Sequence, residues 1–538
     1  MKAKVIGAML ALLLAVGVAG AETPYLLGWV RQLGSPGNDR AESVATDGSG
    51  NVYISGFTDG NLGGANAGGL DAFLVKYNSA GNLLWTRQFG TTAQETGGSV
   101  KVDGSGNAYV AGRTYGSLGG ANAGGEDAFL VKYDSGGGLL WKRQLGTGAG
   151  DYAVSVDLDG SGNVYIAGGT MGSLGGPNTG GYDAFLAKYD SGGALVWKRQ
   201  LGTGVGDYGR AVAVDGSGQH VYIAGMTYGN LSGANAGSLD AFLAKYNSDG
   251  AVLWKRQLGT GDNDDTFSVA VDGLGNAYMT GYTLGSLGGP NAGSYDAYLA
   301  KYDGAGGLLW TRQLGTGQAD DALSVALDRS GNAYIAGRTW GALGETNAGG
   351  GDSMLAKYDS AGNLHWVCQL GTADFDGAYS VDLDGSGNVF IAGYTWGSLG
   401  GANAGGPEDA FLAKYVNPEP ATPWVEAEAG GPYIIDVGQT MLLNGSLSIA
   451  SDNITSYLWD LDGDGEYDDA SGSNPPIGYD YLANSLGLTQ GEHTVFLQVM
   501  TSQGLSAVDN ATLLLAPEPA TLSLLALGGL AMLRRRRR

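Results

Sequence analysis

The sequence predicts an all-β protein whose larger part is a seven-bladed β-propeller with four-stranded blades. Two observations lead to this fold class. Tryptophan recurs seven times at a spacing of 56 residues, once 57, and every recurrence carries the same flanking motifs. Glycine supplies 99 of the 538 residues without a Gly-X-Y period, which is typical of short strands joined by tight turns. Repeats of this length indicate propeller blades or solenoid turns.

Each repeat has the same landmarks. A glutamine follows the tryptophan by three residues, a turn of the form DGSGN begins eighteen residues after it, and a run like DAFLVKY comes later. The segments around DGSGN predict one hairpin, and DAFLVKY with LLWKRQL predicts a second. Four antiparallel strands make one propeller blade. The seven tryptophans are Trp29, Trp85, Trp141, Trp197, Trp254, Trp310 and Trp366.

The phase of the repeat predicts how the ring closes. The chain starts with an outermost strand, Leu26 to Leu33, that has no blade before it, and the last repeat stops after a third strand at Tyr415. We expect the first strand to complete the last blade, which leaves no open edge there. The propeller is therefore predicted over residues 25–415.

The recurrent GNVYIAG and DAFLVKYD runs resemble the SBBP repeat, a bacterial β-propeller repeat, and NHL repeats are similar in strand order. The resemblance covers about 390 residues. It implies a fold and no single activity, because propellers host many functions.

Residues 416–424 are predicted as a linker, and residues 425–515 form a second strand-rich unit without the tryptophan rhythm. Gly430-Gly431-Pro432-Tyr433 and Tyr457-Leu458-Trp459-Asp460 in this unit resemble a PKD domain. That resemblance implies an immunoglobulin-like β-sandwich, used as a spacer or adhesive module on surface proteins.

The N-terminus predicts export. Lys2 and Lys4 precede an apolar run that ends before Ala19-Gly20-Ala21, the pattern of a secretory signal peptide over residues 1–21.

Residues 516–538 contain Pro517-Glu518-Pro519, a short apolar stretch and five arginines. This order resembles the PEP-CTERM sorting signal. It implies an exosortase as partner, transient membrane contact through the C-terminal helix, and a final place on the cell surface or in the extracellular matrix of a Gram-negative bacterium. The alternative is a short membrane anchor.

The charge balance excludes one class of partner. The chain has 29 basic and 53 acidic residues, a formal net charge of −24, so binding of nucleic acid by a basic surface is not expected. The single cysteine, Cys368, excludes an intramolecular disulfide. It stands where other repeats have arginine, and we interpret it as a chance substitution on an outer strand.

Closely spaced carboxylates in the second unit are candidate calcium ligands. Asp460, Asp462, Asp464 and Asp468 lie on a glycine-rich turn, and carboxylate oxygens suit a hard cation. Position twelve of an EF-hand loop would be Ser471, so that loop type is not supported. The alternative is an acidic turn exposed to water.

A second set of acids occurs in the propeller, ten residues after each tryptophan. They are Asp39, Glu95, Asp151, Asp207, Asp264, Asp320 and Asp376. Their loops enter the innermost strands, so one hypothesis places them around the mouth of the central channel, where they would repel one another unless paired. We favour the other hypothesis, that each acid caps its own loop through backbone N–H groups.

Ligand binding is expected where the blades differ. Varied residues flank an invariant threonine after each GNVYIAG strand, on the face of the long loops. Aromatic rings there can stack on sugars, and arginine can pair with acids; the alternative is packing between blades. The candidates are Arg113, Tyr115, Tyr228, Tyr282, Arg338, Trp340, Tyr394 and Trp396.

These features favour an exported, non-catalytic surface or matrix protein that binds a polysaccharide or protein through the long-loop face. The histidines His220, His365 and His493 lack metal-ligand spacing, and no GxSxG motif occurs. Two alternatives stay open: a carbohydrate-active hydrolase or lyase that uses acids at the channel mouth, and a passive structural matrix component.

Overall fold

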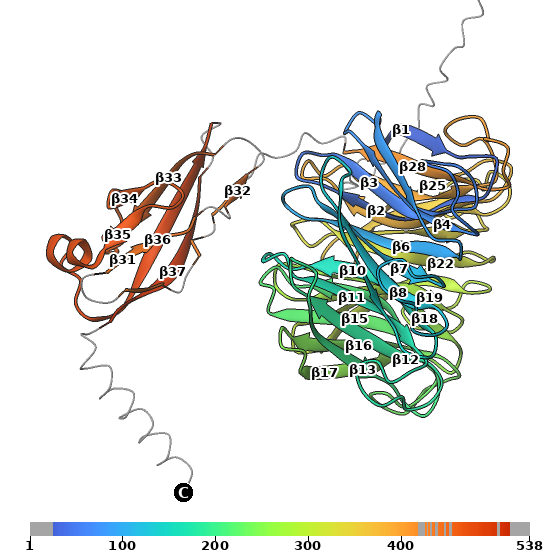
Figure 1. Cartoon of the computed structure of the whole chain (residues 1–538), viewed down its shortest axis with the longest axis horizontal. Helices are drawn as coiled ribbons and strands as arrows, with labels where there is room; N and C mark the ends of the chain where they lie inside the picture. The colour runs from blue at the N-terminus through green and yellow to red at the C-terminus, as the bar shows by residue number, and fades with distance from the viewer. Residues whose placement is uncertain are drawn as a thin grey trace, which may run out of the picture. The chain divides into compact units, whose positions relative to one another are not determined.

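The computed structural model describes residues 25–417, 425–427, 429–430, 433–435, 439–445, 448–450, 454–502 and 506–516. The chain forms two compact units that divide after residue 418, and each is described by itself (Figure 1). The predicted signal peptide lies outside the described residues, as do residues 418–424 of the predicted linker and 517–538 of the predicted sorting signal.

Residues 25–417 form seven four-stranded antiparallel sheets, the blades, whose strands are named in order from the innermost outwards. Blade 1 contains β2 (Asp39–Thr46), β3 (Val52–Thr58), β4 (Asp71–Tyr77) and β5 (Leu83–Phe89). Blade 2 contains β6 (Glu95–Val102), β7 (Ala108–Thr114), β8 (Asp127–Tyr133) and β9 (Leu139–Leu145). Blade 3 contains β10 (Asp151–Leu158), β11 (Val164–Thr170), β12 (Asp183–Tyr189) and β13 (Leu195–Leu201).

Blade 4 contains β14 (Asp207–Val214), β15 (His220–Thr227), β16 (Asp240–Asn247) and β17 (Val252–Leu258). Blade 5 contains β18 (Asp264–Val271), β19 (Ala277–Thr283), β20 (Asp296–Tyr302) and β21 (Leu308–Leu314). Blade 6 contains β22 (Asp320–Leu327), β23 (Ala333–Thr339), β24 (Asp352–Tyr358) and β25 (Leu364–Leu370). Blade 7 contains β26 (Asp376–Leu383), β27 (Val389–Thr395), β28 (Asp409–Val416) and β1 (Leu26–Leu33).

The two ends of the propeller meet in blade 7. β1 is antiparallel to β28 and pairs Leu26 with Val416 at one end and Leu33 with Ala410 at the other. The innermost strand of each blade contacts that of the next, and β26 contacts β2, which closes the ring. The phase of the repeat predicts this pairing. β28 extends one residue beyond the predicted boundary at Tyr415, because Val416 still pairs with β1.

The middle strands of each blade are buried on both faces, which explains why they have short apolar runs without alternation. Tyr53 and Phe73 of blade 1 are fully buried. Tyr53 packs with Phe129 of blade 2 in one core, and Phe73 packs with Phe390 of blade 7 in another. The blades thus bury their faces against each other.

The DGSGN turn is held by its own aspartate. The Asp47 carboxylate accepts the backbone N–H groups of Ser49 and Asn51 at 3.0 and 2.9 Å and the Asn51 amide at 2.8 Å. Gly50 has a φ of 74°, which a residue with a side chain rarely adopts. This turn chemistry explains why the motif recurs.

An arginine on the outermost strand fastens each of six blades to the next. Arg87 of β5, for example, donates from Nε to the carbonyl of Gly137 in the outer hairpin turn of blade 2 at 2.7 Å. Arg31 of β1 donates to Gly81 of blade 1 at 2.8 Å in the same way. The same bond is made by Arg143, Arg199, Arg256 and Arg312.

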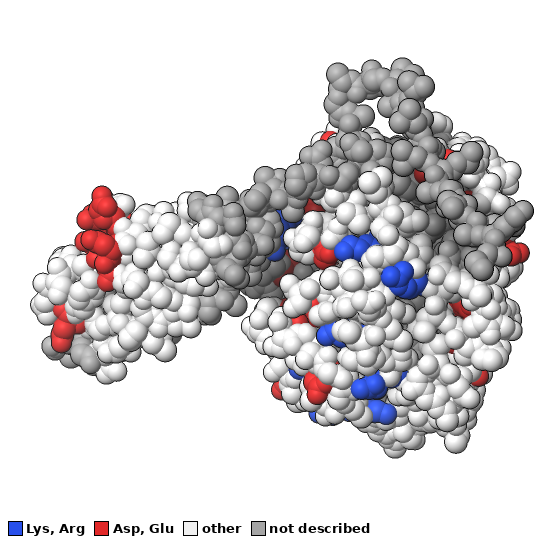
Figure 2. Space-filling view, turned by 90° about the horizontal axis from the view of Figure 1, so that it is seen from above, with Lys and Arg blue, Asp and Glu red and all other residues white. Residues whose placement is uncertain are grey.

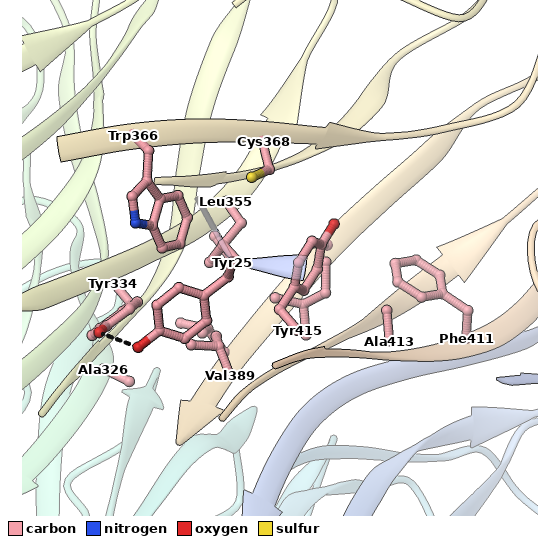
Figure 3. Close-up of a cluster of buried hydrophobic side chains, with 14 residues drawn as sticks. Tyr25, Ala326, Tyr334, Leu355, Trp366, Cys368, Val389, Phe411, Ala413 and Tyr415 are labelled. Atoms are coloured by element: carbon pink, nitrogen blue, oxygen red, sulfur yellow. Dashed lines mark hydrogen bonds between the residues drawn. The ribbon is translucent and has the colours of Figure 1, made fainter. Parts of the chain in front are cut away.

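The junction from blade 6 to blade 7 is different, and it corrects the interpretation of Cys368. The outer strands of blade 7 come from opposite ends of the propeller, so no hairpin turn joins them and an arginine at position 368 would lack its carbonyl partner. Tyr25 packs there instead, 5.2 Å from the ring of Trp366 and 5.9 Å from that of Tyr334, whose hydroxyl it meets at 3.0 Å (Figure 3). Burial raises the pKa of the Cys368 thiol to about 12, so it is a packing residue.

The second unit is also rich in strands. Its largest sheet has the order β30 (Tyr433–Ile435), β37 (Ser506–Leu515), β36 (Gly491–Thr501), β33 (Ile454–Asp460) and β34 (Ala470–Ser471). Two strand pairs accompany it, β29 (Val425–Glu426) with β32 (Ile449–Ala450) and β31 (Thr440–Leu442) with β35 (Pro476–Gly478). Trp459, Leu497 and Leu513 are fully buried in its core. The PKD-type sandwich stays a prediction.

The described part of the chain contains one short helix, the π-helical turn η1 (Tyr481–Ser485). No helix within the described ranges has the length and apolar character needed to span a membrane.

Candidate binding site at the mouth of the propeller channel

The long loops of every blade are braced on one face by a glutamine and an aspartate. In blade 1 the Gln88 side chain accepts the N–H of Leu62 at 2.8 Å and donates to the carbonyl of Gly60 and to Asp71, both at 2.9 Å. All seven glutamines bond to their loops in this manner. The loop face is therefore a preorganised surface.

The seven acids that follow the tryptophans are fully buried, so the hypothesis of an open ring of acids at the mouth is wrong. Each accepts the backbone N–H of the residue four positions before it, as Asp207 does from Thr203 at 2.6 Å. Asp207 also accepts the hydroxyls of Thr203 and Thr227 at 2.8 and 2.5 Å. Burial raises the pKa of Asp207. These acids hold the loops together from inside.

A β-bulge at the same place on every innermost strand places one residue at the channel. In blade 1 the pairing with β3 shifts between Ala41 and Ser43, and Glu42 is the extra residue. Bulges re-aim side chains in this way. All seven bulge residues are half-buried and line one channel cavity of about 460 Å³. They are Glu42, Gly98, Val154, Arg210, Phe267, Leu323 and Tyr379, different in every blade.

A second cavity of about 610 Å³ opens at the mouth of the channel on the long-loop face. It shares Glu42, Arg210 and Tyr379 with the channel and extends outwards over blades 1 to 4. Its further polar and aromatic lining residues are Arg40, Phe57, Thr96, Arg113, Glu126, Tyr152, Tyr182 and Tyr208. We call this space the mouth cavity.

Tyrosines form one wall of the mouth cavity. The ring of Tyr182 lies 5.6 Å from that of Tyr152 and 5.2 Å from that of Tyr208, and Tyr208 lies 6.5 Å from Tyr228. Rings in mutual edge and tilted contact lose little freedom when a ligand binds, and they offer apolar faces with polar hydroxyls. This wall suits a flat ligand with both apolar and hydroxyl-bearing surfaces.

Four arginines surround the cavity, and each is paired with an acid. Arg40 pairs with Glu408 through two donors. Arg113 lies 3.4 Å from Glu126, Arg210 lies 3.7 Å from Asp265, and Arg338 pairs with Asp321. Arg338 also donates to the hydroxyl of Tyr379 at 2.9 Å. Each arginine therefore has an acid at 3.7 Å or less, while the buried Nε of Arg210 has no hydrogen-bond partner among the described residues.

Glu42 is a carboxylate without such a partner. Within the described residues, its side chain makes no hydrogen bond or ion pair. Burial in the channel raises the pKa of Glu42 to about 7, against the fields of Arg40, Arg113 and Arg338. The mouth thus contains one acid in excess of its arginines.

Of the eight residues predicted to bind ligand, Arg113 lines the mouth cavity. Two others stand beside its lining: Tyr228 contacts Tyr208, and Arg338 contacts Tyr379. Tyr115 and Trp396 are about half exposed, at 49% and 51%.

The remaining predicted residues are part of aromatic clusters. Tyr282 packs 5.1 Å from Tyr295 and 5.9 Å from Phe267. Trp340, Trp396 and Tyr394 all pack on Phe375, at 5.9, 5.3 and 5.4 Å. Tyr394 is buried, at 5% exposure, so its prediction as an exposed binding residue is wrong; Arg40 covers its ring at 4.3 Å.

Neither the bulge residues nor the tyrosine wall is predicted from the sequence. The signal that could have found the bulges is the fourth residue of each innermost strand, because it differs in all seven repeats while its neighbours barely change. A bulge cannot be located from an alternating pattern, since it adds a residue to one strand only.

The acidic turn of the second unit gathers a different set of carboxylates from the one predicted. Oxygens of Asp460, Asp462 and Asp469 lie within 4.8 Å of one another. Asp464 instead accepts the N–H of Glu466 at 2.8 Å, and Asp468 is outside the group as well. Figure 2 shows acidic side chains gathered on this unit, whereas Lys and Arg stand singly on the visible side of the propeller. Calcium binding there stays a prediction.

Comparison with known proteins gives the repeat type. Six segments match the family described as "SBBP: Beta-propeller repeat": residues 28–63, 84–119, 140–175, 196–232, 253–288 and 309–345. Each begins in an outermost strand and runs through the first two strands of the next blade.

Two curated relatives match in sequence. The regulatory protein FlaEY of Caulobacter vibrioides is 28% identical over 167 residues, which are 28% of this chain and 18% of that protein. The uncharacterized WD repeat-containing protein L264 of Acanthamoeba polyphaga mimivirus is 21% identical over 504 residues, covering 70% of this chain and 36% of that protein. The chain thus spans well under half the length of either relative.

Solved structures are similar only at a distance. The extracellular domain of a hybrid two-component system from B. thetaiotaomicron is 13% identical, with 90% of this chain and 56% of that one covered and a TM-score of 0.35. A puromycin hydrolase is also 13% identical, with coverage of 76% and 60% and a TM-score of 0.42. Likenesses at this level say nothing about function. The six matched segments and the repeated four-stranded sheets together show that the propeller contains segments similar to the SBBP β-propeller repeat.

Proposed function

We propose that this chain is an exported, non-catalytic protein of the Gram-negative cell surface or extracellular matrix, and that it binds a glycan at the mouth of the propeller channel. One observation carries the proposal. At a position where the framework around it repeats, seven different residues, six with side chains and Gly98, line the channel beside a cavity walled by tyrosines. Repetition preserves the scaffold, so divergence at an accessible site indicates selection for a ligand.

The shape and chemistry of the mouth cavity favour a sugar polymer. Sugar rings have one flat apolar face that stacks on an aromatic ring and hydroxyls that pair with polar groups at its edge. Tyr152, Tyr182 and Tyr208 provide such faces, and Thr96 and the paired arginines provide the polar edge. Export and sorting rest on the two terminal segments, which lie outside the described residues.

The alternative of a carbohydrate-active enzyme drew its support from the acids that follow the tryptophans. Those acids are fully buried and hold backbone N–H groups, so a substrate cannot reach them. A passive matrix protein would need no cavity lined by a different residue from each blade.

The test is binding of the purified full chain to an array of bacterial surface polysaccharides, followed by calorimetry with the best ligand. Tyr182→Ala and Tyr208→Ala should each weaken binding about tenfold, because each removes a stacking face. Leu274→Ala is the matched control, since Leu274 is 87% exposed on a DGSGN-type turn at the other end of the blade.

Three results would overturn the proposal: no glycan bound, equal affinity in the tyrosine variants and the parent, or release of shortened sugar products. The last result would establish catalysis instead. Binding of a protein ligand alone would move the proposal to protein recognition at the same face.

A further inference from the structure

The charges around the mouth cavity specify the ligand more narrowly than its shape does. Arg40, Arg113 and Arg338 each pair with an acid at 3.4 Å or less. Arg210 lies 3.7 Å from Asp265, and its buried Nε has no hydrogen-bond partner among the described residues. A second group of charges lies deeper in the channel, where Lys101 is 3.6 Å from Asp157. The surplus charge at the mouth is the Glu42 carboxylate.

Glu42 is placed for contact with a ligand. It is the bulge residue of β2, it is half-buried, and it lines both the channel and the mouth cavity. A carboxylate held away from bulk water without a hydrogen-bond donor is costly, and a cation that reaches it forms a charge-assisted hydrogen bond. The tyrosine wall adds electron-rich ring faces, which also favour a cation.

We infer that the glycan bound at the mouth carries free, protonated amino groups, and that Glu42 pairs with one of them. The inference rests on the proposed function, because it assigns a chemical class to the ligand of the same site. Sugars in this class are hexosamines without an acetyl group. An N-acetylated sugar of the same length has the same ring faces but no positive charge, so the two separate stacking from charge recognition.

The experiment compares two probes on the full chain by calorimetry: a glucosamine hexasaccharide and its fully N-acetylated counterpart. The parent should bind the free amine at least about tenfold more tightly. Glu42→Gln keeps the size and shape of the side chain and should lower the affinity for the free amine to about that for the acetylated probe. Glu345→Gln is the matched control, because Glu345 is exposed on a long loop of blade 6 and does not line the mouth cavity.

The outcomes distinguish a failure of the amine inference from a failure of the proposed function. If both probes bind equally well and Tyr182→Ala weakens the binding of both, the amine inference is overturned and glycan binding is left intact. Binding unaffected by Tyr182→Ala would overturn the proposed function itself. A preference for the amine that survives Glu42→Gln would overturn the role of Glu42. A lysine hexapeptide that binds as tightly as the glucosamine probe, and that loses binding in Glu42→Gln, would replace the glycan by a cationic peptide. Thermal unfolding of each variant verifies that it is folded.

Discussion

The framework of the ring and the mouth of its channel differ in how their residues repeat from blade to blade. The framework uses a buried acid at the start of every innermost strand and a glutamine that braces every long loop. In six blades it also uses a serine that accepts a backbone N–H of the next innermost strand. At the bulge, three residues after that acid, all seven residues differ. Duplication has kept what holds the ring together and has changed what faces the channel.

The same comparison explains one framework position that changes. The arginine that fastens neighbouring blades is kept wherever a hairpin turn stands opposite it, as for Arg87 and Gly137. Position 368 faces blade 7, whose two outer strands are not joined by a hairpin turn, and cysteine replaces arginine there. A departure from the repeat thus has a cause in the framework itself, unlike the departures in the mouth cavity.

The largest expected difference between the two regions is in stability. Asp207→Ala removes the acceptor of three hydrogen bonds to buried groups of Thr203 and Thr227, and we expect a loss of about 4 kcal/mol in the free energy of unfolding. Tyr228→Ala at the mouth, where Tyr228 is 47% exposed, should cost about 0.5 kcal/mol. Denaturant unfolding of both variants measures this, and similar losses would contradict the division into framework and mouth.

The junction between blades 6 and 7 should show the next largest loss of stability on substitution. Tyr25→Ala removes a ring that packs on Trp366 and Tyr334, and we expect a loss of about 3 kcal/mol. Tyr25→Phe keeps the ring and loses only the hydroxyl contact with Tyr334, which should cost about 1 kcal/mol. If Tyr25→Ala unfolds at the same denaturant concentration as the parent, the chain end does not seal the ring.

A smaller effect should appear as pH dependence. Burial raises the pKa of Asp207 and Asp264, that of Asp265 to about 6 and that of Glu42 to about 7. In this case the folded state binds protons more readily than the unfolded chain, so stability increases as pH falls and is lost as pH rises through the raised pKa values. We expect a higher free energy of unfolding at about pH 5.5 than at about pH 8.

Glu42→Gln should flatten the upper part of this pH dependence, and Glu345→Gln should leave it unchanged. A carboxyl whose pKa is lowered, such as Asp103, changes its protonation only below the ordinary pKa of aspartate. Such groups therefore do not contribute to the difference in stability between about pH 5.5 and about pH 8. A free energy of unfolding that decreases from pH 8 to pH 5.5 would show that the burial of these acids is not what controls stability.

Much of the framework could be predicted from the sequence because it is encoded locally and repeated. The DGSGN turns, the four strands of each repeat and the pairing of β1 with β28 follow from turn residues, alternation and the phase of the repeat. The buried state of Asp207 and its relatives also agrees with their occurrence in every unit.

The mouth cavity could be predicted only in part. Arg113 was found through its variation between repeats, but Glu42 and Tyr208 depend on the bulge and on which loops meet across blades. The substitution at Cys368 had no visible cause until the missing hairpin turn of blade 7 was known. Contacts of this kind join residues that are far apart in the chain, so no local sequence pattern predicts them.

Hydrogen–deuterium exchange with and without the bound glycan tests most directly whether the mouth cavity is the binding site. Protection should concentrate in the segments around Arg40, Arg113, Tyr182 and Tyr208, with no change in the DGSGN turns at the other end of each blade. Protection confined to those turns, to the outermost strands or to the second unit would place the ligand elsewhere and contradict the account.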